Sequence, residues 1–418
     1  MIKKDSNFRA LALPALESIR LLMAELDDPQ KAYPCIHVAG TNGKGSVCAY
    51  LQAMFTRAGI RTGKYISPHL IHECERISVD GTEISPGELN RWMRLVEAAA
   101  EKTQKKTGTP PTMFELWTAA AFCYFREQNC GMVILETGLG GTHDATNIIP
   151  PPAVSVITRI DLDHMDYLGT TLTQVAAAKA GIIKQRPDGM PGLTVTIPQP
   201  PEAMAVLART CREKNHRLVV IQAPSVHTPV GMGECFDYGG LKCVRLRMPG
   251  VYQVENACLA AEAARGAGLS SEAVRYGLEA AVNPARLETV WPGVIFDGAH
   301  NPNGMRALIQ SLDRYFPHTP RTFVFGCMRD KEIPGVLAEM TRTDGPVETV
   351  YTVRIQGSQR AMPPAALAAL ARKVGLPARP VDRLSTAVAA ARESGGLCIV
   401  CGSLYLYQEL RQMQKNWE

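Results

Sequence analysis

The sequence predicts an α/β protein with two domains, and three observations support this prediction. The chain has 418 residues, which exceeds the usual size of one domain. Short apolar runs typical of buried strands alternate with amphipathic helical patterns, as expected for a parallel sheet covered by helices on both faces. The alternation begins a second time after residue 293, so we expect two separate sheets.

The first half contains the larger expected domain. Its apolar runs predict strands at residues 35–39, 132–135 and 154–158. Helical spacing is found at residues 11–26, 47–57, 86–101, 114–128, 254–266 and 271–282. Between residues 193 and 248, short β-like pieces such as 218–221 and 243–246 are broken by Gly and Pro, which predicts a small peripheral β-sheet.

The second half predicts a smaller, Rossmann-like α/β domain. Strands are expected at residues 294–296, 323–325, 349–353 and 398–400, and helices at residues 305–312, 333–340, 364–374 and 385–392. The segment Asn283-Pro284-Ala285 is the expected hinge. We therefore assign residues 1–283 to the first domain and residues 287–418 to the second.

Composition argues against several classes of function. The formal net charge is +5, and the lysine-rich run at 102–106 is short enough to be a solvated helix end, so we expect no nucleic-acid binding. No apolar run approaches the roughly 18 residues of a membrane span, and the N-terminus lacks a signal-peptide core. The 12 cysteines are scattered, which suits reduced thiols in a cytoplasmic protein. We expect ordinary buried thiols at Cys398 and Cys401 rather than a zinc or redox site.

A glycine-rich segment, Gly-Thr-Asn-Gly-Lys-Gly-Ser at residues 40–46, follows the first expected strand and precedes a helix. This arrangement binds phosphate, because backbone N–H groups, the helix N-terminus and the lysine all favour anionic oxygens. The hydroxyl of Ser46 can ligate Mg²⁺. The strict Walker A spacing fails, since Val38 replaces its first glycine and Gly45 separates Lys44 from Ser46. The segment therefore predicts a variant phosphate-binding loop.

Polar residues follow three other expected strands, where the ligand crevice of a parallel sheet lies. Glu136 at the end of one strand is either a Mg²⁺ ligand or a cap. The acidic and imidazole side chains of residues 161–166 fit a metal or phosphate site, or a structural role. Residues 297–302 either face a crevice or cap the next helix. Lys179, in an alanine-rich helix, is either a surface lysine or a desolvated amine that acts as a base or reacts with CO₂.

Together these segments resemble the folylpolyglutamate synthase/dihydrofolate synthase family, a branch of the Mur ligase superfamily. The resemblance spans nearly the whole chain, and the order and number of its motifs make it specific. It is carried by residues 37–46, 67–70, 75–77, 114–115, 136–141, 144–147, 163–164, 168–169, 179–184, 253, 256, 286–288, 297–302, 325–326, 330–331 and 402–406. The irregular phosphate loop is the normal form of that superfamily.

The resemblance implies an ATP-dependent ligase of folate biosynthesis and one-carbon metabolism. It implies that L-glutamate is added to dihydropteroate, to the tail of folate, or to both, through an acyl phosphate. It also implies two Mg²⁺ ions, a carbamylated Lys179, a monovalent cation and a monomeric protein.

The resemblance further assigns roles to individual residues. The implied nucleotide-binding residues are Gly40, Thr41, Asn42, Gly43, Lys44, Gly45, Ser46, Asn256, Arg286 and Asp297. The implied metal ligands are Ser46, Glu136 and His164, and the implied catalytic residues are Lys44, Lys179, Asp297 and His300. The implied substrate-binding residues are Ser67, Arg76, Phe114, Asp144 and Ala145.

The chain departs from the family pattern at three places. Thr142-His143 stands where the family often has Arg-Leu, Ala178 where it has Glu, and Ala285 where it usually has Gly. The first change removes a positive charge near the pterin or phosphate region, but none of the three removes a proposed metal ligand.

Two alternative functions remain. A Mur-type peptidoglycan ligase usually carries an additional N-terminal uridine-nucleotide domain, whereas only residues 1–34 precede the phosphate-loop strand here. A P-loop switch protein that hydrolyses nucleotide without ligation would not need the second α/β domain with Asp297 and His300.

Overall fold

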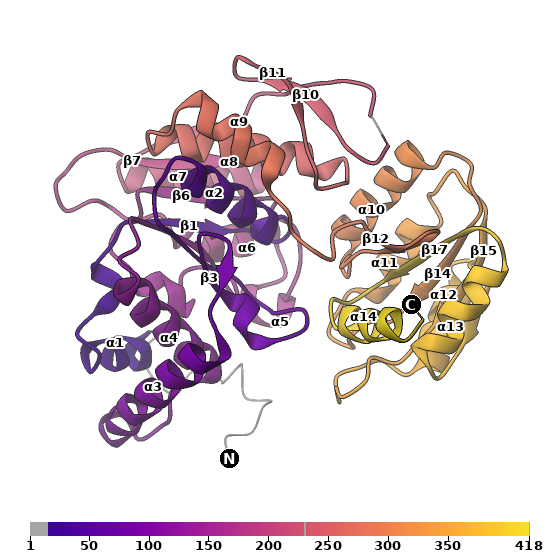
Figure 1. The fold of residues 1–418 in the computed structure, drawn as a ribbon, viewed down its shortest axis with the longest axis horizontal. Helices are drawn as coiled ribbons and strands as arrows, with labels where there is room; N and C mark the ends of the chain where they lie inside the picture. Colours follow the sequence, from indigo (N-terminus) through magenta and orange to yellow (C-terminus); the bar gives the residue numbers. More distant parts are fainter. Residues whose placement is uncertain (1–15, 230, 418) are drawn as a thin grey trace. The chain divides into compact units, whose positions relative to one another are not determined.

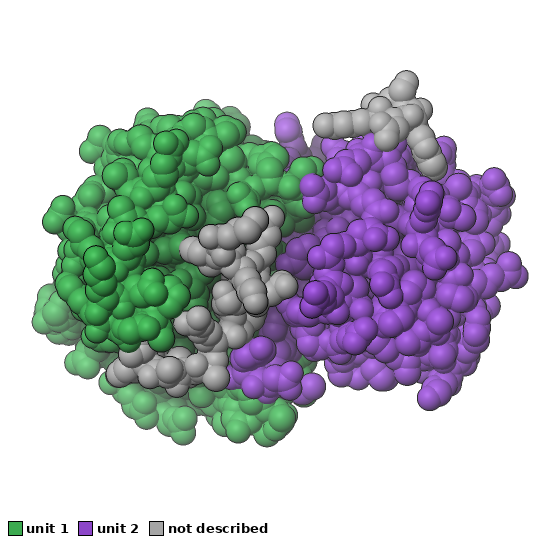
Figure 2. All heavy atoms as spheres, turned by 90° about the horizontal axis from the view of Figure 1, so that it is seen from below, with its two compact units in different colours: residues 1–162, 168–223, 256–281 green, residues 163–167, 224–255, 282–418 purple. Residues whose placement is uncertain are grey.

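The computed structural model describes residues 16–229 and 231–417, with side chains up to residue 414. The chain divides into two units, which are coloured separately in Figure 2. Unit 1 contains the described residues up to 162, residues 168–223 and residues 256–281. Unit 2 contains residues 163–167, residues 224–255 and the described residues from 282 onward.

An eight-stranded sheet forms the centre of unit 1, with strand order β4-β3-β2-β5-β1-β6-β7-β8. Figure 1 labels β1, β3, β6 and β7 of this sheet. Its strands are β1 (Cys35–Ala39), β2 (Thr62–Tyr65), β3 (Ile77–Val79), β4 (Thr82–Glu83), β5 (Met132–Glu136), β6 (Val154–Ile157), β7 (Gly192–Thr196) and β8 (His216–Val220). In this spatial order, each neighbouring pair of strands from β2 to β8 is parallel. Strand β3 pairs antiparallel with both β2 and β4. Because β1 lies between β5 and β6, the loop that follows β1 starts near the middle of the sheet.

Helices connect and cover these strands. They are α1 (Glu17–Ala24), α2 (Lys44–Arg57), α3 (Pro86–Thr107), α4 (Met113–Glu127), α6 (Leu172–Ala180), α7 (Pro201–Glu213) and α9 (Ser271–Ala280), with 3₁₀ turns η1 (Pro29–Lys31), η2 (Glu73–Arg76) and η3 (Ala145–Ile148). Two further helices, α5 (Met165–Leu168) and α8 (Tyr252–Gly266), contain residues of both units. Residues 11–15 of the expected first helix lie outside the described residues, and α1 corresponds to the rest of it.

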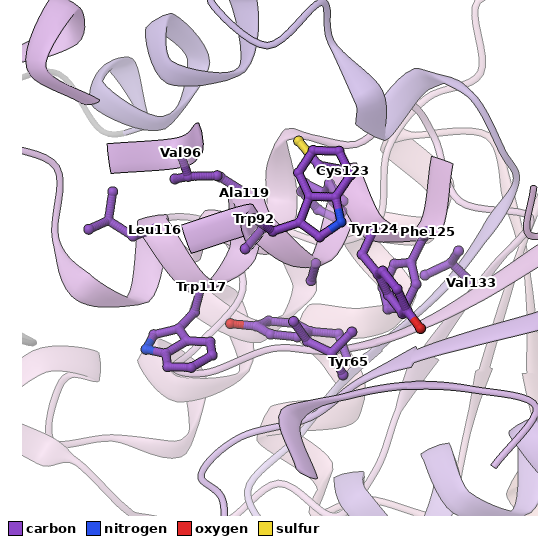
Figure 3. Close-up of a cluster of buried hydrophobic side chains, with 14 of the residues drawn as sticks. Tyr65, Trp92, Val96, Leu116, Trp117, Ala119, Cys123, Tyr124, Phe125 and Val133 are labelled. Carbon is purple, nitrogen blue, oxygen red and sulfur yellow. The ribbon is translucent and has the colours of Figure 1, made fainter. Parts of the chain in front are cut away.

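The main core of unit 1 lies where α1, α3 and α4 pack against the sheet. Helix α4 begins with a capping box, since Thr112 and Glu115 each accept a hydrogen bond from the other's backbone N–H. Its residues 116–125 are all buried. Figure 3 shows Trp92 of α3 and Trp117 of α4 in this core, together with Tyr65 of β2. Each large apolar side chain buried here contributes about 1.5–3 kcal/mol, so the core fixes β2 and β5 firmly.

Unit 2 contains a six-stranded sheet with order β12-β13-β17-β14-β15-β16. Its strands are β12 (Glu288–Trp291), β13 (Val294–Phe296), β14 (Arg321–Phe325), β15 (Val347–Thr352), β16 (Ala378–Pro380) and β17 (Leu397–Cys401). Only the β12–β13 pair of this sheet is antiparallel. The helices are α10 (Pro302–Tyr315), α11 (Ile333–Met340), α12 (Pro364–Lys373), α13 (Leu384–Glu393) and α14 (Leu406–Trp417). This is the second α/β fold that the sequence predicts.

A three-stranded antiparallel sheet also belongs to unit 2. It is formed by β9 (Ser225–Val226), β10 (Cys235–Tyr238) and β11 (Leu241–Arg245). The buried carboxylate of Glu234 anchors it, because Glu234 accepts hydrogen bonds from Arg314 and from the Tyr315 hydroxyl of α10. The expected peripheral sheet is therefore smaller than the sequence pattern indicated, since β7 and β8 continue the large sheet of unit 1.

Several other expectations meet the structure directly. Residues 102–106 lie at the end of α3, where Lys102 and Lys106 pair with Glu25, the residue that follows α1. Cys398 and Cys401 are buried on β17, and burial raises the pKa of the Cys398 thiol to about 12 and that of Cys401 well above its usual value. Both thiols are thus protonated and behave as packing groups. Within residues 16–229 and 231–417, the structure contains no helix with the length and apolarity to cross a bilayer.

Candidate functional site

The phosphate loop leaves β1 in a conformation that only glycine fits well. Gly40 has φ +154°, and a Cβ atom there would lie 1.7 Å from Oγ1 of Thr158. The next residue is fixed by the segment after β6: the Thr41 backbone N–H donates to the carbonyl of Arg159 at 2.7 Å. The Thr41 hydroxyl donates to the carbonyl of Asp161 and accepts from its N–H. The loop is therefore pre-formed.

Helix α2 presents its N-terminus at the end of this loop. Gly43, with φ +92°, occupies the N-cap position, and no side chain caps the first turn. The uncapped N–H groups and the helix dipole favour an anion at this point. A Cβ at Gly43 would lie 2.4 Å from Oδ1 of Asn256, which places the Asn256 side chain directly beside the loop. Ser46 is buried in the first turn.

Two lysines share one carbonyl acceptor in the loop. Nζ of Lys44 lies 3.2 Å from the Gly40 carbonyl and 3.3 Å from the Thr41 carbonyl. Nζ of Lys179, on α6, donates to the same Gly40 carbonyl at 2.8 Å. Lys179 is only 4% exposed, so the structure favours the buried reading of this residue over the surface reading. Two lysine side chains thus lie at the loop.

Glu136 closes β5 beside the loop strand. It pairs in register with Val38 of β1, it is 6% exposed, and its Oε2 accepts from the N–H of Ser67 at 3.3 Å. Lys64 on the neighbouring strand β2 has its pKa lowered by burial, with the charge of Glu136 acting in the opposite direction. The sequence did not identify Lys64 as a residue near the site, because β2 has no apolar pattern that would predict a strand there.

The segment from Ser67 to Arg76 is folded on itself. The Glu75 carboxylate accepts three consecutive backbone N–H groups, those of residues 70–72. The Arg76 Nε donates to Nδ1 of His69 at 2.9 Å, and its guanidinium lies 5.5 Å from the ring centroid of Trp117. Burial, followed by the charge of Arg76, lowers the pKa of His69. This compact loop carries two of the expected substrate residues.

A second loop carries Asp144 and Ala145, and Phe114 of α4 packs against it. The ring of Phe114 lies against Gly138, where a Cβ would approach it to 2.5 Å. Asp144 accepts from the N–H of Leu139 at 2.8 Å and from both the N–H and hydroxyl of Thr146. Burial raises the pKa of Asp144, and these hydrogen bonds oppose the rise. Asp144 therefore shapes the loop, and Ala145 follows it, buried, at the start of η3.

In unit 2, Asp297 organises the loop after β13. Its carboxylate accepts from the N–H groups of Leu287 and Ala299, both at 2.8 Å, and from the Tyr252 hydroxyl at 3.0 Å. Burial raises the pKa of Asp297, while the positive charge of Arg286 acts against the rise. Asp297 is thus fully engaged in holding the backbone around Arg286.

His300, Asn301 and Lys331 meet at Asp163. Lys331 Nζ lies 2.7 Å from Oδ1 of Asp163, Asn301 donates to Oδ2 at 3.2 Å, and Nε2 of His300 lies 3.7 Å from Oδ2. Burial alone would raise the pKa of Asp163, but His300 and Lys331 outweigh it and hold that pKa well below its usual range. His300 donates from Nδ1 to the Gly298 carbonyl, which fixes the orientation of its ring.

The same cluster shows how Asn301 and His164 are placed. Asn301 caps α10 through the N–H of Gly304, as the capping interpretation expected. Nε2 of His164 lies 3.4 Å from Nζ of Lys331, so the imidazole faces a cation in this structure. Lys331 was part of the sequence motifs but was not among the expected site residues. Its partner is 168 positions away in sequence, and spacing offers no signal for such a contact.

The expected site residues thus form two groups. Unit 1 holds the loop residues 40–46 with Asn256 and Lys179 beside them, and Glu136 with Ser67. Unit 2 holds Arg286, Asp297, His300 and His164. No cluster of three or more His, Cys, Asp or Glu side chains suited to a metal occurs among the described residues. Mg²⁺ commonly takes one or two protein oxygens plus phosphate and water, and the buried oxygens of Ser46 and Glu136 fit that pattern.

Ala285, next to Arg286, carries backbone strain. Its φ is +59°, a left-handed conformation that costs a residue with a Cβ about 1–2 kcal/mol. We expect Ala285→Gly to be more stable than the matched change Ala281→Gly by about this amount, since Ala281 is equally buried but has φ −62°. Urea unfolding of both variants measures the difference. Equal shifts in the two variants would show that position 285 is unstrained.

Two family models match this sequence. The model described as "Mur ligase middle domain" matches residues 38–264, and the one described as "Mur ligase, glutamate ligase domain" matches residues 285–404. The dihydrofolate synthase/folylpolyglutamate synthase of Mycobacterium tuberculosis is 38% identical over 384 residues, covering 85% of this chain and 77% of that protein.

Solved structures give the same picture. The Mycobacterium tuberculosis folylpolyglutamate synthase complexed with ADP and AMPPCP superposes with a TM-score of 0.89 and 32% identity, covering 96% of this chain and 95% of the other. The Escherichia coli FolC structure in complex with DHPP and ADP superposes with a TM-score of 0.84 and 28% identity, covering 98% and 96%. Both similarities extend over the two units.

Proposed function

This chain belongs to the folylpolyglutamate synthase/dihydrofolate synthase family of the Mur ligase superfamily, and from this premise we propose that it joins L-glutamate to a pteroate or folate carboxylate at the cost of ATP. The observation that carries the proposal is the phosphate loop. Gly40 and Gly43 leave no room for a side chain, and Lys44, Lys179 and the N-terminus of α2 all lie at the loop. The relatives complexed with ADP and AMPPCP support a nucleotide as the ligand of this loop.

ATP binds through the loop residues 40–46. The backbone N–H groups at the start of α2 face the phosphate oxygens, and Lys44 turns from the Gly40 carbonyl toward the β- and γ-phosphates. Asn256, held beside Gly43, contacts the nucleotide from the same unit. The family resemblance also assigns Arg286, Asp297 and His300 to the nucleotide, and Asp297 holds the backbone that carries Arg286.

Ser46 and Glu136 hold one Mg²⁺ ion, and His164 contributes to a second. Bound Mg²⁺ supplies positive charge that neutralises the phosphoryl oxygens during transfer. Lys179 acts in this region as a carbamate, which forms when its neutral amine adds CO₂ and releases a proton. Its burial beside the loop supports this role, because a desolvated lysine is readily deprotonated. A monovalent cation is a further ligand of the same site.

The reaction runs in two steps. A substrate carboxylate oxygen attacks the γ-phosphorus, the bond to ADP breaks, and an acyl phosphate forms. The α-amine of glutamate then attacks the acyl carbon, phosphate leaves with its electron pair, and an amide results. Lys44 stabilises the charge on the transferred group, and Ser67, Arg76, Phe114, Asp144 and Ala145 hold the pteroate end. The acyl phosphate is prone to hydrolysis, so the site must exclude water.

ADP release measured with dihydropteroate and tetrahydrofolate side by side tests this proposal. We expect release that requires both L-glutamate and at least one of the two carboxylate substrates. The preferred substrate distinguishes synthesis of dihydrofolate from extension of the glutamate tail. ADP release that needs a muramyl nucleotide, or that proceeds without glutamate, would contradict the proposal in favour of a peptidoglycan ligase or a nucleotide switch. We further propose a monomeric, cytoplasmic enzyme that binds neither nucleic acid nor membrane, which a sedimentation measurement and cell fractionation examine.

A further inference from the structure

A buried chain of polar groups joins the phosphate-loop strand to the loop that carries Asp144. His37 of β1 is fully buried, and its Nε2 lies 2.7 Å from Oγ1 of Thr146. The Thr146 hydroxyl in turn lies 2.6 Å from Oδ1 of Asp144. Thr146 is also fully buried, and Asp144 nearly so. The three residues therefore form one continuous hydrogen-bonded path from strand β1 to the loop that carries Asp144.

The direction of the hydrogen bonds follows from the protonation states. Burial, with the charge of Lys184 acting in the same direction, holds the pKa of His37 well below its usual value, so its imidazole is neutral and has one N–H. The Asp144 carboxylate accepts hydrogen bonds, so the Thr146 hydroxyl donates to it. The same hydroxyl must then accept the proton of His37 Nε2.

The other imidazole nitrogen of His37, Nδ1, is a buried polar atom that makes no hydrogen bond with any of the described residues. A buried acceptor of this kind costs about 1–3 kcal/mol, so this histidine does not serve stability alone. The N–H group at Nε2 makes the hydrogen bond to Thr146, whereas the buried acceptor at Nδ1 is an energetic penalty of placing a histidine at this position.

The loop is held firmly at its far end as well. Nζ of Lys184 donates to the carbonyls of Asn147 and Ile149, both at 2.6 Å, and the Asn147 amide donates to the Gly181 carbonyl at 3.0 Å. These contacts attach η3 to the segment after α6. His37 adds the contact from β1, the strand that continues into Gly40.

We propose that His37 is a positioning residue for the carboxylate substrate. Through Thr146 it fixes the Asp144–Ala145 segment relative to β1, so that a pteroate or folate bound by that segment presents its carboxylate to the phosphate held after β1. This inference rests on the proposed function. Its physical basis is that a displaced segment binds the substrate less tightly, and that misplacement of a reacting group by about 1 Å can also cost about 100-fold in rate.

Two near-isosteric variants separate the two nitrogens of His37. In His37→Gln the amide nitrogen reaches the place of Nε2, and the unpartnered Nδ1 is removed. In His37→Asn the amide reaches only the place of Nδ1, so the bond to Thr146 is lost. We expect Gln to keep the KM for the pteroate or folate substrate within about threefold, and Asn to raise it about tenfold or more, as the loss of one buried hydrogen bond implies. The KM for ATP stays unchanged in both variants.

The second partner provides an independent pair of variants, which is needed if His37→Asn does not fold. Thr146→Val removes the hydroxyl and matches His37→Asn, whereas Thr146→Ser keeps it and matches His37→Gln. Ser155→Ala is the control. Ser155 is buried and lies opposite His37 in the β1–β6 register, but its hydroxyl donates to the Ile182 carbonyl and not to the Asp144 loop. We expect Ser155→Ala to leave the KM for every substrate unchanged.

The outcomes distinguish this inference from the function on which it rests. An active native protein whose Gln and Asn variants, or Ser and Val variants, share one KM for the carboxylate substrate overturns the role of His37 alone. A shift of similar size in Ser155→Ala also overturns it, because the effect would then be a general response of the core. A native protein without glutamate-dependent ADP release overturns the proposed function and this inference together.

Discussion

Replacing Lys44 by alanine is expected to abolish turnover, with a fall in kcat of at least about 10³-fold, the scale for removing a charged group that stabilises a transferring phosphoryl oxygen. Lys44 is the first residue of α2, and its ammonium folds over the Gly40 and Thr41 carbonyls of the loop. Alanine has the highest helix propensity, so the variant should retain α2 and fold normally. Steady-state ADP release and circular dichroism measure the two effects separately.

Cys401→Ala is the matched control for this experiment. Cys401 is fully buried on β17 and is not part of the proposed machinery, so its replacement should lower stability slightly and leave the kinetics largely intact. The reverse ranking of the two variants would overturn the assignment of the site. Loss of activity in both would indicate that unit 2 responds to small changes in its core.

Lys179→Ala is expected to lower kcat by about 100-fold or more, the scale for loss of one preorganised electrostatic contact at a reacting group. Lys179 is the buried residue that donates to the Gly40 carbonyl from the side of α6. Alanine removes both this hydrogen bond and any carbamate formed on the amine. The surrounding helix is already alanine-rich, so α6 should persist.

Chemical rescue distinguishes the two forms of Lys179. If the carbamate is the working form, acetate or propionate should restore part of the activity of Lys179→Ala, because a small carboxylate can occupy the vacated space. The same additives should not restore Lys44→Ala, where a cation is missing. Absence of rescue, together with a crystal structure in which Lys179 bears no added group, would leave the plain amine as the working form.

The sequence predicted the elements whose signal is local. Strands β1, β5 and β6 are continuous apolar runs buried on both faces, and the pattern therefore marked them almost to the residue. Strand β2 has the sequence Thr-Gly-Lys-Tyr, in which only the tyrosine is a large apolar residue, so it carried no such mark. Strand β8 was recognised as β-like at residues 218–221 but assigned to a separate sheet, because its pairing with β7, and the pairing of β7 with β6, are long-range properties.

The same distinction between local and long-range signals applies to the candidate site. The phosphate loop was predicted because its glycines, lysine and hydroxyl are adjacent in sequence. The pairing of Asp163 with Lys331 was not, since nothing in the spacing of two distant charges indicates that they meet. His37 was passed over for another reason: within an apolar strand it resembles a residue of the core, and only its contact with Thr146 reveals a polar path.

The position of Arg76 over Trp117 gives this protein an optical probe of its own. Trp117 is rigidly packed in the core, whereas Arg76 ends the loop that begins at Ser67. A cation near an indole ring alters its emission, so any displacement of this loop when a ligand arrives should change the fluorescence spectrum without an attached dye. Substrate-induced loop motion could thus be followed in stopped-flow time courses, with Trp92 in the same core as a constant background (Figure 3).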